Sequence, residues 1–301
     1  MLTTTSSNIP ATPYRGRFAP SPTGPLHLGS LLTALGSYLR ARSLNGEWLL
    51  RMDNIDPPRE DPSAAARIPE QLEQHGLHWD GEIFYQSTQI TEYNKRLQQL
   101  IDQELAYYCT CSRQRLRDIG GTYDRHCVNN RPEETHDAAV RFKFDHGFHW
   151  EDAVQGTQDM HPEALLGDFV IHRRDKLPSY QLAAAVDDMN QQITEVARGA
   201  DLIESTARQG ALICAMGGTP PAYAHLPLLC SADGNKLSKQ FHAPPLEARC
   251  AKDNLYHCLT WLNQRPPSTL QQSSIPDILS WAIENWSMQS VPNTISSAAL
   301  C

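Results

Sequence analysis

The chain has 301 residues and a formal net charge of -8, with 40% hydrophobic and 20% charged residues. This composition is typical of a globular protein and excludes a disordered one, and the length allows one large domain or two ordinary ones. The acidic balance argues against a surface coated with basic residues for non-specific nucleic-acid binding, but it does not exclude a local basic groove.

The sequence contains no export or membrane signal. No apolar run approaches the roughly 20 residues that a membrane span needs, and the opening segment has neither the cationic start nor the apolar stretch of a signal peptide. We therefore expect a cytoplasmic protein without membrane contacts. Its eight cysteines should then be reduced, and a tight cluster among them indicates a metal site before a disulfide.

The first hundred residues predict alternating strands and helices. Apolar residues at three- and four-residue spacing, such as Leu28, Leu31 and Leu35, predict the helices. Alternation of this kind is typical of a doubly wound parallel sheet. In chain order we expect a flexible tail over residues 1–14, a strand over 16–19, a Pro/Gly turn over 20–25, a helix over 28–39, a strand over 48–52, and helices over 64–74 and 91–106.

The alternation breaks between residue 107 and about residue 166, where a cysteine cluster and polar loops occur. Strands are predicted again over 168–172 and 192–197, and an amphipathic helix begins near Pro276. We predict an α/β fold, a Rossmann-like doubly wound parallel sheet with a small insertion and a short helical C-terminal region. The predicted units are a catalytic domain over 15–107 and 167–240, an insertion over 108–166, and a C-terminal region over 241–301.

The segment from Arg17 to Ser30 carries the first candidate site. A strand ends, a proline-stiffened turn follows, and His27 and Gly29 fall in the first turn of the predicted helix. Unpaired N–H groups and the positive end of the helix dipole favour phosphate there. Gly29 lets a nucleotide lie against the backbone, and His27 can donate to a phosphate oxygen. Alone, the segment also fits an ordinary helix-capping turn.

A second candidate site follows near the other end, where the turn at Gly234 leads into Lys236 and Lys239. A loop with two ammonium groups can close on a triphosphate and neutralise the charge that develops as pyrophosphate leaves. A lysine pair by itself is usually solvated surface. Together with the first motif, in this order, it predicts that both segments converge on one nucleotide triphosphate.

These segments resemble the two signature motifs of the glutamate-type class I aminoacyl-tRNA synthetases, which match residues 27–30 and 236–240. The match is closer to a shortened group, the glutamyl-Q tRNA(Asp) synthetases, which the segments 17–24, 56–59, 76–80 and 236–239 resemble. The resemblance covers roughly residues 15–245. It implies an ATP site. The residues implied for ATP are His27, Gly29, Ser30 and Lys239, and those implied for catalysis are His27, Lys236 and Lys239.

A glutamate pocket needs cations for two carboxylates and an anion for the ammonium group. Arg17 and Arg198 offer guanidinium forks at predicted strand ends, where α/β proteins gather their sites. The resemblance implies that this pocket includes Ala19, Ser21 and Tyr180 as well. From the residues alone, surface salt bridges and core packing are the competing interpretations.

Asp53 departs from the family pattern, which usually places a glutamate there to face the substrate ammonium. The aspartate keeps the charge, but its reach is one methylene shorter. We predict that Asp53 still binds the ammonium group of glutamate, directly or through a water.

Cys109, Cys111 and Cys127 cluster within the insertion. Three thiolates and one further ligand complete a tetrahedral structural zinc shell, and the metal replaces the core that a short insertion lacks. The resemblance implies Tyr123 as the fourth ligand, whereas ordinary zinc chemistry makes His126 an alternative. Three reduced cysteines in a loop are the remaining interpretation.

The resemblance also implies the reaction. ATP, with Mg²⁺ bridging its phosphates, and L-glutamate give glutamyl-adenylate, from which an RNA hydroxyl takes the glutamate. Because the segment after residue 240 is too short for an anticodon-binding domain, the implied acceptor is the queuosine base in the anticodon loop of tRNA(Asp). The alternatives are a tRNA(Glu) acceptor end, a catalytically silent amino-acid sensor or RNA binder, and a nucleotidyltransferase. We expect a monomer.

Overall fold

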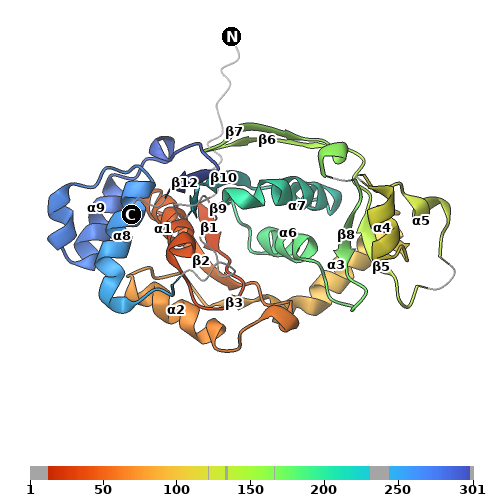
Figure 1. Ribbon diagram of the computed structural model, residues 1–301, viewed down its shortest axis with the longest axis horizontal. Helices are drawn as coiled ribbons and strands as arrows, with labels where there is room; N and C mark the ends of the chain where they lie inside the picture. The colour runs from red at the N-terminus through yellow and green to blue at the C-terminus, as the bar shows by residue number, and fades with distance from the viewer. Residues whose placement is uncertain (1–12, 121, 133–134, 166, 231–243, 299–301) are drawn as a thin grey trace, which may run out of the picture.

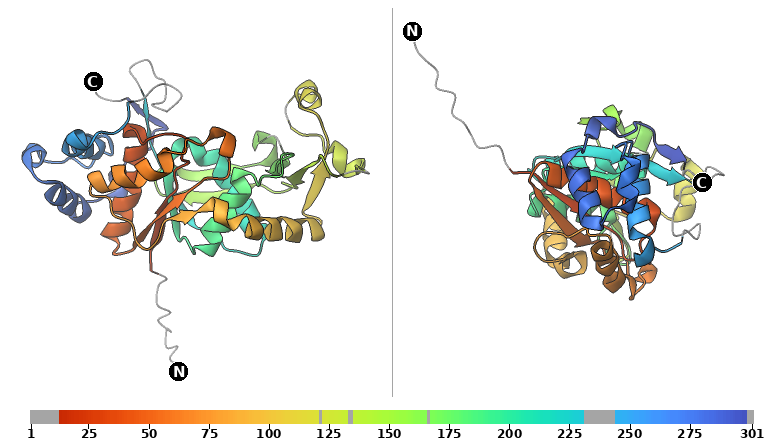
Figure 2. Two further views of the ribbon diagram at one scale, coloured as in Figure 1. Left: turned by 90° about the horizontal axis from the view of Figure 1, so that it is seen from below. Right: turned by 90° about the vertical axis from the view of Figure 1, so that its left-hand side faces the viewer.

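The computed structural model describes residues 13–298 apart from 121, 133–134, 166 and 231–243. Strands and the helices around them occupy the middle of the molecule (Figure 1). The C-terminal helices lie at one end of the long axis, and the segment that interrupts the sheet reaches the other end, as Figure 1 and the left view of Figure 2 agree.

Parallel strands form the centre of the fold. β1 (Arg15–Phe18) pairs with β2 (Glu47–Met52), and β2 pairs with β3 (Phe84–Tyr85). A second parallel pair is formed by β9 (Glu195–Gly199) and β10 (Ala222–Leu226). The predicted strands over 16–19 and 48–52 therefore exist and pair with each other.

The two groups of strands meet at β1 and β9. The backbone N–H of Thr194, just before β9, donates to the carbonyl of Arg15 at 2.9 Å. The strand order runs from β1 towards β3 on one side and from β9 towards β10 on the other. This is a doubly wound sheet with its switch point between β1 and β9, where such proteins bind ligands. The predicted Rossmann-like α/β fold is confirmed.

Helices cover both faces of the sheet and build one core on each. Successive side chains of a strand point to opposite faces, so neighbouring residues join different cores. Leu50 of β2 packs with α1 (Leu28–Ser43), and Val196 of β9 packs with α6 (Tyr180–Asn190) and α7 (Ile203–Ala215). The leucine stripe that predicted the first helix lies in the core, with Leu31, Leu32, Leu35 and Leu39 buried.

Helix α2 (Ala64–Gln74) has the predicted bounds, but two other boundaries are wrong. The helix predicted over 91–106 is α3 (Ile90–Asp102), which ends because Glu104 adopts a φ of 58° and Ala106 already belongs to a strand. The strand predicted over 192–197 begins only at Glu195, since Gln192 has a φ of 54°. Positive φ values at residues other than glycine are uncommon and give little sequence signal.

The interrupting segment contains a small antiparallel sheet. Its strands are β4 (Ala106–Cys109), β5 (Ala139–Phe142) and β8 (Phe169–His172), in that order. Two short helices, α4 (Arg113–Ile119) and α5 (His126–Asn129), lie between β4 and β5 in the chain. β8 falls in the stretch that we assigned to the catalytic domain, so by strand pairing it belongs with the insertion.

A hairpin within the same segment returns to the main sheet. β6 (Phe148–Asp152) pairs antiparallel with β7 (Gly156–Met160), and Asp152 of β6 pairs in parallel with Tyr223 of β10. The sequence analysis did not predict this hairpin. It extends the catalytic sheet with residues from within the predicted insertion.

The C-terminal region packs against α1. Helices α8 (Ala251–Trp261) and α9 (Ile275–Glu284) contribute Leu255 and Ile278 to the α1 core. The helix predicted near Pro276 is thus present. The short strand β11 (Leu228–Cys230) pairs in parallel with β12 (Ser296–Ala298). Among the helices that the structure describes, none has the length and apolar character to cross a membrane.

Candidate active site

A cavity of about 570 Å³ opens at the switch point of the sheet. Its walls come from the end of β1, the turn after it, the start of α1, the start of α6 and the end of β9. It brings together most of the residues that the sequence singled out. These are Arg17, Ala19, Ser21, His27, Gly29, Ser30, Tyr180 and Arg198.

On the β1 wall, Arg17 belongs to a buried network of charges. Its Nε donates to Oδ1 of Asp188 at 3.1 Å, and its side chain is only 4% exposed. Arg51, which is fully buried, donates from Nη1 to Oδ1 of Asp188 at 2.7 Å and from Nε to Oδ1 of Asp53 at 2.8 Å. The charge of Arg17 is therefore already matched by protein carboxylates.

The three aspartates around Arg51 differ in their pKa. Burial by itself raises the pKa of Asp188, but Arg17 and Arg51 overcome that effect and hold it at about 2. Burial raises the pKa of Asp187 to about 7, against the attraction of Arg51 and the hydrogen bond from Gln86. Burial also raises the pKa of Asp53, although Arg51 opposes it. Asp188 is thus the firmly ionised member of the network.

His27 forms the N-cap of α1. Its Nδ1 accepts from the backbone N–H groups of Gly29 at 3.1 Å and Ser30 at 3.4 Å, and Oγ of Ser30 accepts from the backbone N–H of His27 at 2.8 Å. A neutral ring that accepts at Nδ1 carries its proton on Nε2. The prediction that the first N–H groups of this helix are unpaired and can bind phosphate is wrong for two of them, because they donate to the side chain of His27.

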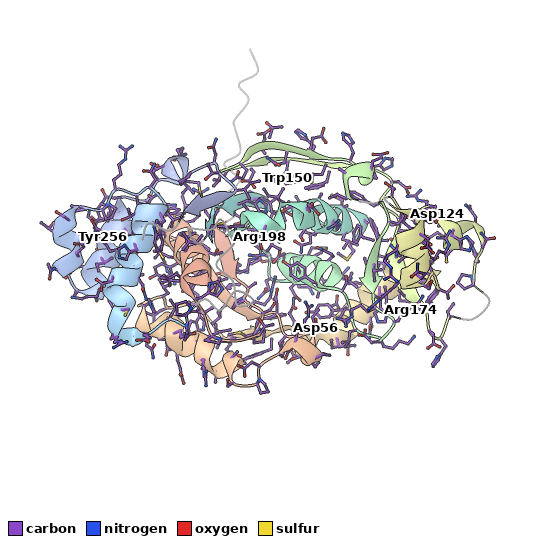
Figure 3. All side chains as sticks on the ribbon, in the orientation of Figure 1. Asp56, Asp124, Trp150, Arg174, Arg198 and Tyr256 are labelled. Carbon is purple, nitrogen blue, oxygen red and sulfur yellow. The ribbon has the colours of Figure 1, made fainter. Side chains whose placement is uncertain are left out.

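Arg198 occupies the β9 wall and is 4% exposed. Its Nη1 donates to Oε1 of Gln209 at 2.7 Å, its Nη2 to Oγ1 of Thr206 at 2.6 Å, and its Nε to Nε2 of His225 at 3.3 Å. All of these partners are neutral. Within the described residues, no carboxylate lies at ion-pair distance from Arg198. Figure 3 shows Arg198 near the middle of the molecule, far from Asp124 in the insertion.

Of the predicted residues that the structure describes, Asp53 does not line the cavity. Asp53 lies behind the β1 wall, 7% exposed, with Oδ1 in the ion pair to Arg51. Lys236 and Lys239 lie outside the described residues. Sequence reasoning missed Asp188 and His225, because a carboxylate within a helix and a histidine within a strand carry no motif.

The three predicted zinc-ligand cysteines lie together in the insertion. The Sγ atoms of Cys109, Cys111 and Cys127 are within 4.8 Å of one another, and those of Cys111 and Cys127 are 3.5 Å apart. The hydroxyl of Tyr123 lies 3.4 Å from Sγ of Cys109 and 3.3 Å from Sγ of Cys111. His126 is exposed, and its Nδ1 lies 3.4 Å from Nδ2 of Asn130.

These distances fit a tetrahedral zinc shell. Bonds of about 2.3 Å to sulfur and about 2.0 Å to oxygen put tetrahedral sulfur pairs about 3.8 Å apart and oxygen–sulfur pairs about 3.5 Å apart. The guanidinium of Arg141 lies 4.2 Å above the Tyr123 ring, and its Nε donates to Sγ of Cys109 at 3.4 Å. A buried cation there offsets the negative charge of ligated thiolates. The cluster can therefore hold a metal ion.

Comparisons with known proteins agree with this geometry. Residues 14–244 match the family described as tRNA synthetases class I (E and Q), catalytic domain. The proteins named glutamyl-Q tRNA(Asp) synthetase of Pectobacterium atrosepticum and Salmonella typhi are each 48% identical to this chain and cover 93% of it. The alignments span 87% and 94% of those proteins. The chain belongs to the glutamyl-Q tRNA(Asp) synthetase family.

Solved structures of glutamate tRNA ligases have the same fold. A glutamate tRNA ligase from Elizabethkingia meningosepticum, solved with its amino acid, superimposes with a TM-score of 0.81 at 25% identity. It covers 96% of this chain, and 67% of that chain is matched. The glutamate-tRNA synthetase of Elizabethkingia anophelis gives a TM-score of 0.80 at 26% identity, over 95% of this chain and 68% of its own. This member of the glutamyl-Q family is therefore an enzyme of the ligase class.

Proposed function

We propose that the protein activates L-glutamate with ATP and transfers it to the queuosine base in the anticodon loop of tRNA(Asp). The observation that carries the proposal is the cavity at the switch point. It joins the capped start of α1 to Arg17, Tyr180 and Arg198 in a chain 48% identical to glutamyl-Q tRNA(Asp) synthetases.

The first step needs no nucleophilic side chain. The α-carboxylate of glutamate attacks the α-phosphorus of ATP, the bond to the β-phosphate oxygen breaks, and glutamyl-adenylate and magnesium pyrophosphate form. Catalysis comes from orientation and from stabilising the charge on the phosphates. His27 can donate from Nε2, because Nδ1 is held by the helix backbone. Lys236 and Lys239 supply positive charge in this proposal.

Arg198 is the cation that we assign to a carboxylate of glutamate. It lines the cavity, and its described partners are all neutral. A buried charge without a counter-ion is costly, so an incoming carboxylate relieves the desolvation of Arg198 as it binds. We also propose that Asp53, which lies behind Arg17 and pairs with Arg51, supplies the negative charge for the ammonium group of glutamate.

In the second step, a hydroxyl of queuosine attacks the carbonyl carbon of glutamyl-adenylate. An ester forms, AMP leaves, and the hydroxyl proton is released. The family assignment favours this acceptor over the acceptor end of tRNA(Glu).

Glutamate-dependent ATP–pyrophosphate exchange tests the activation step. We expect exchange with glutamate and much less with glutamine or aspartate. No exchange with any amino acid, with or without tRNA, would favour a catalytically silent relative.

Labelling of RNA tests the acceptor. Radiolabelled glutamate and ATP are offered with tRNA(Asp) that contains or lacks queuosine, and with tRNA(Glu). We expect label only in queuosine-containing tRNA(Asp). Equal labelling of both forms of tRNA(Asp) would overturn the queuosine assignment, and label confined to tRNA(Glu) would make the acceptor end the target.

We also propose that Cys109, Cys111, Tyr123 and Cys127 hold one zinc ion. Four protein ligands leave no position for a water, so the ion stabilises the insertion and takes no part in the reaction. Elemental analysis should find one equivalent of zinc, and Tyr123→Phe should lower it while His126→Ala does not. Less than half an equivalent in freshly purified protein contradicts the site.

The expected monomer is checked by analytical ultracentrifugation, and the expected cytoplasmic location by cell fractionation.

A further inference from the structure

The buried hydrogen-bond network around Arg198 includes a residue of the β6–β7 hairpin. An arginine has five N–H donors. In Arg198, Nε donates to His225, one Nη1 proton to Gln209, and the two Nη2 protons to Thr206 and to the carbonyl of Leu202 at 3.4 Å. One proton on Nη1 has no acceptor within the described residues, and Arg198 lines the cavity.

His225 can accept from Arg198 only in one tautomer. Its Nε2 lies 3.3 Å from Nε of Arg198 and 2.9 Å from Oγ1 of Thr206. Since Nε of Arg198 always carries a proton, Nε2 of His225 must present its lone pair. Burial lowers the pKa of His225, although the hydrogen bond to Asp152 opposes this effect. The lowered pKa keeps the ring neutral. The single proton of the neutral ring therefore belongs on Nδ1.

Asp152 is the partner that keeps the proton on Nδ1. Its Oδ2 lies 2.5 Å from Nδ1 of His225, and both side chains are fully buried. Its Oδ1 accepts from the backbone N–H groups of Val154 at 3.1 Å, Gln155 at 3.0 Å and His225 at 3.0 Å. One oxygen thus fixes the hairpin turn and the other fixes the tautomer.

We propose that Asp152 is a positioning residue for the amino-acid substrate: through His225 it orients the guanidinium of Arg198 towards a carboxylate in the cavity. The inference rests on the proposed function, because it assigns Arg198 to the substrate. It also gives the hairpin a role, since β6 places Asp152 beside β10. If the guanidinium of Arg198 were hydrogen-bonded only to Gln209 and Thr206, fewer contacts would fix the orientation of its plane.

Asp152→Asn tests the inference with little change in shape. The amide oxygen of asparagine keeps the three backbone hydrogen bonds, and its Nδ2 donates to Nδ1 of His225. His225 must then carry its proton on Nε2, where it faces the Nε proton of Arg198. Two buried donors that face each other disrupt the orientation of Arg198. Asp159→Asn, on the exposed face of the same hairpin, is the matched control.

Two readouts separate positioning from mere stability. Nitrogen NMR chemical shifts of protein whose histidines carry the ¹⁵N isotope report the tautomer of His225 without any substrate. ATP–pyrophosphate exchange reports the KM for glutamate and for ATP separately. We expect the tautomer to switch and the glutamate KM to rise about tenfold or more. The ATP KM and kcat should change by less than about threefold, as for loss of uniform substrate binding.

A double-variant comparison covers the case in which Asp152→Asn alone folds poorly. Glutamine at position 225 has no tautomer, and its amide oxygen can accept from Arg198. In the His225→Gln background, Asp152→Asn should therefore change the glutamate KM by less than about twofold. An additive tenfold effect in that background contradicts the relay.

The remaining outcomes of these experiments also test the inference. An unchanged tautomer in Asp152→Asn, or a switched tautomer with an unchanged glutamate KM, overturns the inference. An equal rise in the KM for ATP and glutamate shows a general structural role and overturns it too. If the wild-type protein shows no glutamate-dependent exchange, the proposed function is wrong, while the tautomer measurement and calorimetric binding of glutamate still test whether Asp152 controls Arg198.

Discussion

The two walls of the cavity present arginines with opposite electrostatic surroundings. On the β1 wall, Arg17 and Arg51 face the carboxylates of Asp53 and Asp188, so positive and negative charges balance. On the β9 wall, Arg198 is equally buried but donates to an amide, a hydroxyl and an imidazole. Charge balance is complete on one side of the pocket and incomplete on the other.

This difference separates stabilisation from recognition. Breaking a buried ion pair is strongly destabilising because an uncompensated charge remains, so the β1 wall should matter most for the folded state. Arg198 has no counter-ion in the part of the chain that the structure describes, so its removal should matter most for binding an anion. The following substitutions test that division.

Asp188→Asn should have the largest effect on stability. It removes the ionised partner that Arg17 and Arg51 share. We expect the free energy of unfolding, measured by urea denaturation, to fall by about 3–5 kcal/mol. The control is Asp175→Asn, whose carboxylate is exposed and pairs with Arg173, and which should change stability by less than about 1 kcal/mol. Similar losses in both variants would show that the buried network is not special.

Arg198→Gln should have the opposite profile. We expect the KM for glutamate in ATP–pyrophosphate exchange to rise about a hundredfold or more, because a buried partner of the substrate carboxylate is lost. The free energy of unfolding should fall by less than about 3 kcal/mol, less than in Asp188→Asn, since the broken hydrogen bonds are to neutral described partners and no uncompensated charge is left behind. A destabilised variant with an unchanged glutamate KM would reverse the roles of the two walls.

Asp53→Asn should have an intermediate effect. The amide oxygen can still accept from Nε of Arg51, so the shape of the network is kept while one charge is lost. If Asp53 serves the substrate ammonium, the glutamate KM should rise about tenfold. A glutamate KM within about twofold of the wild type would remove Asp53 from the proposed site.

Asp187→Asn should have the smallest effect. Burial raises the pKa of Asp187 to about 7, so the folded protein holds a proton that the unfolded chain releases. Stability should therefore fall as pH rises from about 4 to about 7, and the asparagine variant should fall less. Near pH 5 the variant should lose at most about 1 kcal/mol, because Oε1 of Gln86, which is buried and has no partner among the described residues, can accept from the new amide.

Asp188 should show the reverse pH dependence. Its folded-state pKa of about 2 lies below the ordinary value of 3.8. Its contribution to stability is present above about pH 4 and is lost as pH falls towards about 2. Acid denaturation curves of the wild type and Asp188→Asn should converge in that range. A constant difference across it would mean that Asp188 is not held ionised by the two arginines.

The sequence predicted what depends on local pattern. Leucine spacing gave α1, the apolar run from Trp48 gave β2, and the Pro/Gly turn before His27 located the cavity. Strand ends in a parallel sheet meet at one edge, so the positions of Arg17 and Arg198 at two predicted strand ends were enough to place them in one site.

The sequence could not predict what depends on long-range contacts. Asp188 lies in a helix, 171 residues from Arg17, and nothing in its neighbours marks it as a counter-ion. Asp152 lies 73 residues from His225, at the end of a strand that alternates aromatic and polar residues without a motif. The neutral environment of Arg198 is likewise a property of the folded core and not of any segment.

The most direct test of the account is a crystal structure of the protein with bound glutamate. We predict a carboxylate oxygen of the substrate within about 4 Å of the Arg198 guanidinium, with Arg17 still paired to Asp188. A structure in which glutamate lies elsewhere, or in which both substrate carboxylates avoid Arg198, would contradict the assignment of the β9 wall as the anion-binding side of the pocket.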